Sequence, residues 1–189
     1  LMGPDLLLAF SEYHCEMLRS VSNKDMPIEP LLPAVNDNFR PEFDTTREKD
    51  ILYVGDLSEQ KGYPTFLKAL QRLDGDLTLE VDIVGGRPEC YPALETIDIS
   101  FHGVIPREEL PSFYRRAKLF VCLSSDEMGP NTLVESLSCG TPALVNDVNG
   151  VVEYVRGGNG VRCDRSNIAN VEMKLRECLE NADILIKNA

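Results

Sequence analysis

The chain has 189 residues, of which 43% are hydrophobic, and its formal net charge is −12 at pH 7. This length and composition are typical of one ordinary folded domain and exclude a disordered or low-complexity chain. The acidic balance argues against a nucleic-acid partner, because binding a nucleic-acid backbone needs clustered Lys and Arg.

The cellular setting is indicated by the apolar runs and the cysteines. No apolar run approaches the roughly 20 residues of a membrane span, and the first residues lack the basic start of a signal peptide. The six cysteines contain no C-x-x-C spacing. We interpret them as reduced, mostly buried thiols, and we expect a cytoplasmic protein.

Residues 1–45 differ in character from the rest of the chain. Leu6 to Phe10 predicts a strand and Glu12 to Val21 predicts a helix, and an extended stretch punctuated by prolines follows. One strand and one helix cannot form a core of their own. We therefore expect residues 1–45 to be the tail of a preceding domain plus a linker, and residues 46–189 to be the main domain.

From residue 50 onward, β-rich runs alternate with segments of helical period. This alternation indicates βαβ units, so the predicted fold class is α/β, a Rossmann-like doubly wound parallel sheet. The predicted strands are Ile51 to Gly55, Leu77 to Val84, Ile99 to Val104, Leu119 to Leu123, Ala143 to Asn146 and Gly160 to Cys163. The predicted helices are Tyr63 to Leu73, Arg107 to Ala117, Asn131 to Cys139, Val151 to Arg156 and Asn167 to Asn181.

The loops that follow the predicted strands are the places where a ligand binds in an open parallel sheet. The first of them runs from Gly55 to Gly62 and carries Lys61, which could hold a phosphate or could be a solvated lysine. Gly103 follows a later strand, where a glycine lets the backbone approach a flat base or simply makes a turn. No G-x-G-x-x-G follows any predicted strand, which argues against a nicotinamide-dependent oxidoreductase.

A helix start is predicted at Gly129-Pro130, with proline at a first-turn position where its missing N–H costs nothing. The amides of Asn131, Thr132 and Leu133 are then expected to point out of the helix N-terminus. Free amides at a helix N-terminus favour a bound anion.

Two glutamates flank this predicted helix start. Glu127 precedes it and Glu135 lies about one turn inside it, so both could face one bound ligand, with sugar hydroxyls as the obvious candidates. The alternative is that Glu127 favours the helix dipole and that Glu135 is a solvated helical residue.

The two glutamates have an E-x7-E spacing, within the run SSDEMGPNTLVESLSCGTPALVNDVNGVVEYV. Together with ILYVGDLSEQKG and FHGVI, this run resembles the C-terminal, donor-binding domain of GT-B retaining glycosyltransferases of the family 4, group 1 type. That family includes glycogen synthase and the mannosyl- and glucosyltransferases of surface polysaccharides. The similarity extends from about residue 7 to residue 182, with the motifs in the right order.

The resemblance implies transfer of a hexose from a nucleotide diphosphosugar to a hydroxyl acceptor, with retention at the anomeric carbon and without a metal or a resident cofactor. It implies that Lys61 neutralises the donor diphosphate and that Glu127 holds hydroxyls of the transferred sugar, and these two are the implied catalytic residues. It also implies that Glu135 binds the ribose. The implied donor-binding residues are Gly55, Lys61, Gly103, Val104, Glu127, Pro130, Asn131, Thr132 and Glu135.

One residue departs from the family pattern. Asp56 stands where the family has an arginine that assists the lysine, and a carboxylate beside a diphosphate is repulsive. A separate motif, Asp74-Gly75-Asp76, spells the D-x-D of a metal-dependent glycosyltransferase fold, but its place between a helix and a strand is typical of a turn. We therefore expect no metal site there.

The segments LLLAFSEYHCEMLRSV and LLPAVNDNFRP resemble the last strand, the helix and the interdomain linker of the family's N-terminal half. The resemblance implies that the acceptor, a glycan, lipid or small molecule, and any membrane contact belong to that missing half. The isolated chain is expected to transfer nothing by itself. A non-catalytic nucleotide- or sugar-binding module with a degenerate site is the alternative that Asp56 keeps open.

Overall fold

The computed structural model describes residues 6–22, 26–31, 33–42, 45–127 and 129–189. Its centre is a six-stranded sheet with the order β5-β4-β3-β6-β7-β8, in which each recorded pair is parallel. The fold is therefore the predicted Rossmann-like doubly wound α/β fold. The strands of this sheet are β3 (Lys49–Val54), β4 (Leu79–Val84), β5 (Ile97–Gly103), β6 (Ala117–Cys122), β7 (Ala143–Asn146) and β8 (Gly160–Cys163).

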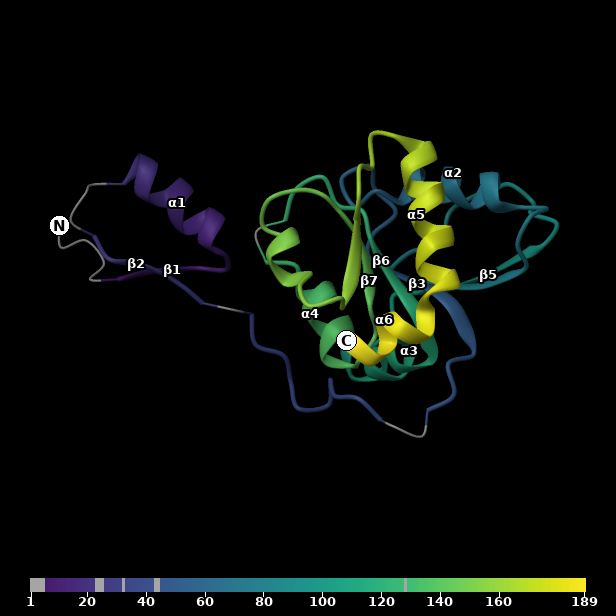
Figure 1. Cartoon of the computed structure of the whole chain (residues 1–189), viewed down its shortest axis with the longest axis horizontal. Helices are drawn as coiled ribbons and strands as arrows, with labels where there is room; N and C mark the ends of the chain where they lie inside the picture. The colour runs from purple at the N-terminus through teal and green to yellow at the C-terminus, as the bar shows by residue number, and fades with distance from the viewer. Residues whose placement is uncertain (1–5, 23–25, 32, 43–44, 128) are drawn as a thin grey trace.

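Helices cover both faces of this sheet, as Figure 1 shows. The helices are α2 (Tyr63–Leu73), α3 (Leu110–Arg116), α4 (Asn131–Ser138), α5 (Ile168–Glu180) and α6 (Ala182–Asn188). Alternating strand residues face one side or the other, so the sheet separates two apolar cores. Phe66 and Leu175 belong to the core under α2 and α5, whereas Phe120 and Leu133 belong to the core under α3 and α4.

Residues before the main sheet form a small separate unit. Strand β1 (Leu7–Ala9), helix α1 (Glu12–Val21) and strand β2 (Ile28–Pro30) make a parallel two-stranded βαβ arrangement, joined to the main sheet by an extended segment (Figure 1). Strand β2 was not predicted, because its three residues include a proline and carry too short a pattern. Within the described ranges, no helix is long and apolar enough to cross a membrane.

The small unit touches the main domain next to the loop that precedes α4. The Glu153 carboxylate accepts hydrogen bonds from the backbone N–H groups of Glu12 and Tyr13, at 3.0 and 3.2 Å, and so caps the start of α1. The Phe10 ring lies so close to Gly129 that a Cβ at Gly129 would meet it at 2.9 Å. The unit is therefore in contact with the segment that carries Glu127.

Several predicted helices differ from the observed ones. The predicted helix from Arg107 begins as a short 3-10 turn, η1 (Arg107–Glu109), before α3. The predicted helix at Val151 is only a 3-10 turn, η2 (Val152–Tyr154), because the segment between two glycine-containing loops is too short for a full helix. Helix α6 follows α5 after Asn181 and was missed, because its pattern continues that of α5.

A buried carboxylate connects the neighbouring strands β4 and β5 to helix α3. Asp82 is 1% exposed, and its two oxygens lie 2.8 Å from His102 Nε2 and 2.5 Å from Arg116 Nη2. The Arg116 guanidinium also lies 4.0 Å from the centroid of the Phe113 ring, within the range of a cation–π contact. The buried Asp82 carboxylate therefore has the partners without which its burial would be strongly destabilising.

Candidate functional site

The centre of the sheet contains a switch point. Strands β4 and β5 follow β3 in sequence on one side of it, and β7 and β8 follow β6 on the other. In open α/β sheets the crevice beyond the carboxyl ends of the strands at such a point is where ligands bind. The loops that meet there are residues 55–62 after β3 and residues 123–130 after β6.

Lys61 and Glu127 come together at this switch point, one from each loop. The Lys61 ammonium donates to Glu127 Oε1 at 2.5 Å, and Ser124 Oγ donates to the same oxygen at 2.8 Å. The Lys61 side chain is 34% exposed and that of Glu127 is 14% exposed, so the pair lies at the protein surface with Glu127 on the inner side. This places a cation for an anionic ligand beside a carboxylate that can accept from neutral hydroxyls.

The support behind Glu127 is built from the loop after β6, the end of β7 and the loop before α5. Ser124 is 3% exposed, and its carbonyl accepts from Asn146 Nδ2 at 2.9 Å. Asn146 Oδ1 accepts in turn from the backbone N–H of Arg165 at 3.1 Å. Because these groups are packed and hydrogen-bonded, Ser124 supports the Glu127 carboxylate independently of Lys61.

Asp56 organises its own loop. Its Oδ1 accepts from the backbone N–H of Ser58 at 2.9 Å, as in an Asx turn. Hydrogen bonds from Ser58, with a smaller contribution from the Lys61 charge, lower the pKa of the Asp56 carboxyl. Asp56 is therefore an ionised turn residue at the position where the resemblance implies an arginine.

Gly62 lets the loop after β3 press against β6. Its φ is +77°, a left-handed conformation that favours glycine. A Cβ at this position would meet the Leu123 carbonyl oxygen at 2.3 Å. The glycine that ends the loop is therefore required by close packing, and it holds Lys61 next to the Glu127 loop.

Helix α4 begins at Asn131, as predicted, but Pro130 is its N-cap and does not occupy the predicted first-turn position. The prediction that three backbone amides are free at this helix start is wrong for Asn131 and Leu133. The Asn131 N–H donates to the Gly129 carbonyl at 2.8 Å, and the Leu133 N–H donates to the Pro130 carbonyl at 3.0 Å. The turn at Gly129-Pro130 supplies these carbonyls, so an anion at this helix start would have to compete with them. The role of Thr132 stays a prediction.

Glu135 is buried, which makes the alternative of a solvated helical residue wrong. It is 3% exposed, and its Oε1 accepts from Arg107 Nε at 3.1 Å and from Arg107 Nη2 at 2.7 Å. Its Oε2 accepts from the Tyr114 hydroxyl at 3.1 Å. Burial, assisted by the nearby Glu135 charge, raises the pKa of Tyr114 well above its ordinary value. Tyr114 therefore stays a hydrogen-bond donor.

Sequence reasoning missed Arg107 and Tyr114. Arg107 follows β5 closely, and this position beyond the end of a strand was the signal that could have drawn attention to it. Tyr114 is an ordinary buried helical residue in the sequence, so no local signal marks its hydroxyl.

The end of β5 lies at the same edge of the sheet. The Gly103 carbonyl accepts from the Gly85 N–H at 2.7 Å, and Gly103 has a φ of +67°. Val104 is 87% exposed, an apolar side chain open to solvent at the place where the resemblance implies a base. Gly55 directly follows β3, and its N–H donates to the Val84 carbonyl at 2.9 Å.

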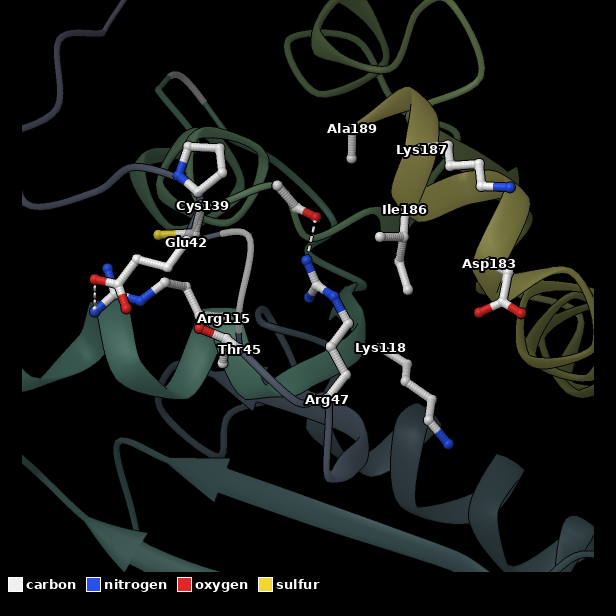
Figure 2. A pocket seen from close by; sticks show the side chains of 12 residues that line it. Glu42, Thr45, Arg47, Arg115, Lys118, Cys139, Asp183, Ile186, Lys187 and Ala189 are labelled. Carbon is white, nitrogen blue, oxygen red and sulfur yellow. Dashed lines mark hydrogen bonds and ion pairs between the residues drawn. The ribbon is translucent and has the colours of Figure 1, made fainter.

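A cavity of about 510 Å³ lies at the opposite, amino-terminal edge of the sheet (Figure 2). Arg47 reaches across it and donates to the Gly140 carbonyl at 2.6 Å, and Arg115 pairs with Glu42 at 3.3 Å. The residues predicted for the site lie at the other edge. The cavity is lined by Pro41, Glu42, Thr45, Arg47, Arg115, Lys118, Cys139, Gly140, Asp183, Ile186, Lys187 and Ala189.

The Asp74-Gly75-Asp76 motif is a turn, as predicted. Asp74 Oδ1 accepts from the backbone N–H of Thr96 at 2.9 Å, and Asp76 pairs with Arg176 at 2.5 Å. In the part of the chain that the structure describes, no three His, Cys, Asp or Glu side chains gather in a way that could hold a metal ion. The cysteines are mostly buried, as expected, and Cys90 is the exposed one.

Residues 35–189 match the sequence model of the family described as Glycosyl transferases, group 1. The chain belongs to this family. The predicted family resemblance is therefore confirmed, and the loops at the switch point are the part of this group 1 glycosyltransferase domain where its ligand is expected.

Two curated relatives are similar to the chain over most of its length. The chain is 27% identical over 182 residues to mannosylfructose-phosphate synthase of Agrobacterium fabrum, covering 82% of this chain and 40% of that protein. It is 29% identical over 140 residues to O-antigen chain mannosyltransferase B of Escherichia coli, covering 69% of this chain and 36% of that protein. The chain thus spans about two fifths of the length of these curated relatives.

Solved structures share the fold. Sucrose-phosphate synthase from Thermosynechococcus elongatus superposes with a TM-score of 0.80 at 19% identity, covering 98% of this chain and 52% of that chain. Anabaena HepE in complex with UDP and glucose superposes with a TM-score of 0.77 at 15% identity, covering 97% of this chain and 57% of that chain. At these identities the likeness establishes the fold.

Proposed function

We propose that this chain is the donor-binding part of a retaining glycosyltransferase, which moves a sugar from a nucleotide diphosphosugar to a hydroxyl acceptor. The observation that carries the proposal is the meeting of Lys61 and Glu127 at the switch point of the sheet, at 2.5 Å. HepE bound to UDP and glucose, and the pneumococcal O-GlcNAc transferase GtfA bound to UDP and GlcNAc, share this fold and support a nucleotide-sugar donor.

In this proposal Lys61 exchanges Glu127 for the donor diphosphate. A lysine is a compact charge that can follow the phosphate as the glycosidic bond breaks, and a positioned cation stabilises the leaving group. Glu127 stays on Ser124, at 2.8 Å, and accepts from hydroxyls of the transferred sugar. The residues Gly55, Pro130 and Thr132 line the path of the phosphates, whereas the Asn131 N–H would first have to leave the Gly129 carbonyl, to which it donates at 2.8 Å.

The nucleoside is assigned to the edge that holds β5. Glu135 accepts from the ribose, and Gly103 and Val104 line the base, whose apolar face would cover the exposed Val104 side chain. No step in this scheme uses a metal or a resident cofactor, since Lys61 supplies the positive charge. We further propose a cytoplasmic location and a role in polysaccharide or glycoconjugate biosynthesis, to which the similarity to an O-antigen mannosyltransferase points.

The acceptor is assigned to an N-terminal half of the protein. Strand β1, helix α1 and strand β2 bury only a small apolar cluster of their own, around Ala9, Cys15 and Ile28. This unit lies against the loop before α4 through Phe10 and against η2 through Glu153. A chain with only this part of the other half is expected to bind donor and to transfer nothing. We expect the whole protein to make no contact with nucleic acid. Contact with a membrane would come through the N-terminal half.

The test is a calorimetric titration of the chain with UDP, GDP, dTDP and ADP and their common sugar conjugates. We expect one nucleotide family to bind, and Lys61→Ala and Glu135→Ala to weaken that binding at least tenfold, a loss typical of a charge-assisted contact. Lys118→Ala is the matched control, because Lys118 pairs with Asp50 at 2.8 Å at the opposite edge of the sheet.

The outcomes separate two functions. If Lys61→Ala binds the nucleotide as strongly as wild type does, the diphosphate does not bind at this loop and the proposal is wrong. The second candidate, a non-catalytic nucleotide- or sugar-binding module, is favoured by Asp56, which adds a negative charge beside the expected diphosphate. Under the transferase proposal Asp56→Arg strengthens nucleotide binding, and the full-length protein transfers sugar from the nucleotide that binds.

A further inference from the structure

The Glu135 carboxylate is held by two other elements of the fold. Arg107 approaches it from η1 and Tyr114 approaches it from α3, while Glu135 itself lies on α4. At 3% exposure an ionised carboxylate needs such partners, because an unpaired buried charge is strongly destabilising. The two donors therefore fix the orientation of a group that a free helical side chain would leave variable.

The hydrogen bonds of this carboxylate are unevenly distributed between its oxygens. Oε1 accepts two hydrogen bonds from Arg107, at 3.1 and 2.7 Å, whereas Oε2 accepts one from Tyr114, at 3.1 Å. A carboxylate offers about four acceptor sites in total, two on each oxygen. The remaining acceptor site is thus on Oε2, next to the Tyr114 hydroxyl, and it suits one hydroxyl of a ligand.

Phe39, from the segment that leads into the main domain, touches both donors. The Arg107 guanidinium lies 5.7 Å from the centroid of its ring, and the ring of Tyr114 lies 6.2 Å from it. Phe39 is 5% exposed, so its ring has a fixed place in the core under α3 and α4. The Arg107 side chain is 61% exposed, and among the described residues the Phe39 ring supports its guanidinium in addition to the Glu135 carboxylate.

We propose that Arg107 and Tyr114 are positioning residues, which aim Glu135 Oε2 at one hydroxyl of the nucleotide ribose, and that Phe39 holds both of them. This inference rests on the proposed function, in which Glu135 binds the ribose. It makes the choice between ribose and deoxyribose a property of four residues, three from helical elements and one from the segment before β3, of which only Glu135 touches the ligand.

The test compares ribose with deoxyribose in each variant. The chain is titrated with UDP, 2′-deoxy-UDP and 3′-deoxy-UDP, and in parallel with the three corresponding forms of GDP. A hydrogen bond to a charged carboxylate predicts that wild type prefers the ribose form over one of the deoxy forms by about tenfold or more. We expect Arg107→Ala and Tyr114→Phe to reduce this ratio to about threefold or less, and Arg107→Lys to restore part of it.

The ratio of two affinities measured on one variant does not depend on how much of that variant is folded. It therefore separates positioning from a structural role. Arg72→Ala is the matched control, since Arg72 also pairs with a glutamate, Glu172, at 2.6 Å, but on the other face of the sheet. We expect this control to keep the wild-type ratio.

Each result has a distinct meaning. A wild-type ratio that persists in Arg107→Ala and Tyr114→Phe overturns this inference and leaves the proposed function intact. If Arg107→Ala binds UDP more tightly than wild type does, with an unchanged ratio of ribose to deoxyribose affinity, the inference is also overturned. Arg107 would then cover Glu135 and would not orient it. Binding by wild type without any ribose preference removes the ribose from Glu135, and absence of binding by wild type overturns the proposed function together with this inference.

Discussion

Replacing Gly62 by alanine tests whether the loop that carries Lys61 is held in place by its packing on β6. The substitution meets two costs. The left-handed φ of +77° costs an L residue roughly 1–2 kcal/mol. The new Cβ would lie 2.3 Å from the Leu123 carbonyl oxygen and 2.6 Å from the Leu123 Cβ, and relieving such overpacking costs about 1–3 kcal/mol. We therefore expect Gly62→Ala to lose about 2–5 kcal/mol of unfolding free energy.

Gly75→Ala is the matched control for this experiment. Gly75 has a φ of +84°, and no atom lies within 4 Å of the Cβ that alanine would add, so this variant meets the conformational cost alone. The effect of alanine on the unfolded chain is the same in both variants and cancels in their difference. The difference between the two variants thus isolates the contact with Leu123, at about 1–3 kcal/mol.

Urea unfolding followed by circular dichroism measures both free energies. In a protein of this size, a loss of 1 kcal/mol of unfolding free energy lowers the Tm by about 2–4 °C. In thermal unfolding, the Tm of Gly62→Ala should therefore lie at least about 2 °C below that of Gly75→Ala. Equal losses in the two variants would refute the reasoning, because the loop would then be free to move away from β6. A weakened nucleotide affinity in Gly62→Ala but not in Gly75→Ala would connect this packing to the site.

Three further outcomes follow from the buried and ionised groups. Asp82→Asn should lose about 1–3 kcal/mol in urea unfolding, since the Arg116 guanidinium loses its carboxylate and His102 Nε2 loses its hydrogen-bond partner, while the exposed Glu80→Gln should change stability by less than about 1 kcal/mol. A thiol reagent at pH 8 should label Cys90 alone in the folded protein and all six cysteines in urea, because burial keeps the other thiols inaccessible, and a second fast thiol would contradict the fold. Backbone hydrogen bonds lower the pKa of Asp74, so its contribution to stability is present above pH 4 and is lost as the pH falls. Stability should then decline less between pH 6 and pH 3 in Asp74→Ala than in wild type, and an identical decline would show that these hydrogen bonds do not depend on its charge.

The parts of the fold that were predicted correctly are those with a strong local pattern. The six strands of the main sheet are short apolar runs bounded by turn residues, and helices such as α2 and α5 have clear periodicity. The loops of the candidate site were expected at one edge of the sheet, because parallel strands bring their carboxyl ends together there, and that the ligand binds there stays a prediction. Lys61 and Glu127, the residues expected there from two different loops, are in contact.

The remaining features depend on contacts that a local pattern does not contain. The pairing of Arg107 with Glu135 joins residues from different elements, and the burial of Glu135 depends on how α3 packs against α4. The amides at the start of α4 looked free because the helix rule describes an ideal terminus, whereas the Gly129-Pro130 turn folds back onto them. Strand β2 exists because β1 lies beside it, and its own three residues do not predict it.

The contact between Lys61 and Glu127 also bears on how the protein folds. It joins residues 66 positions apart, and it becomes possible only when β3 pairs with β6, a pairing that skips β4 and β5 in the sequence. Closing such a long loop carries an entropic cost, which slows the formation of nonlocal parallel pairs. We therefore expect the loops that carry Lys61 and Glu127 to meet late in folding, in the same step that completes the centre of the sheet, so that a chain with local helices and no β3–β6 pairing would not bring these two residues together.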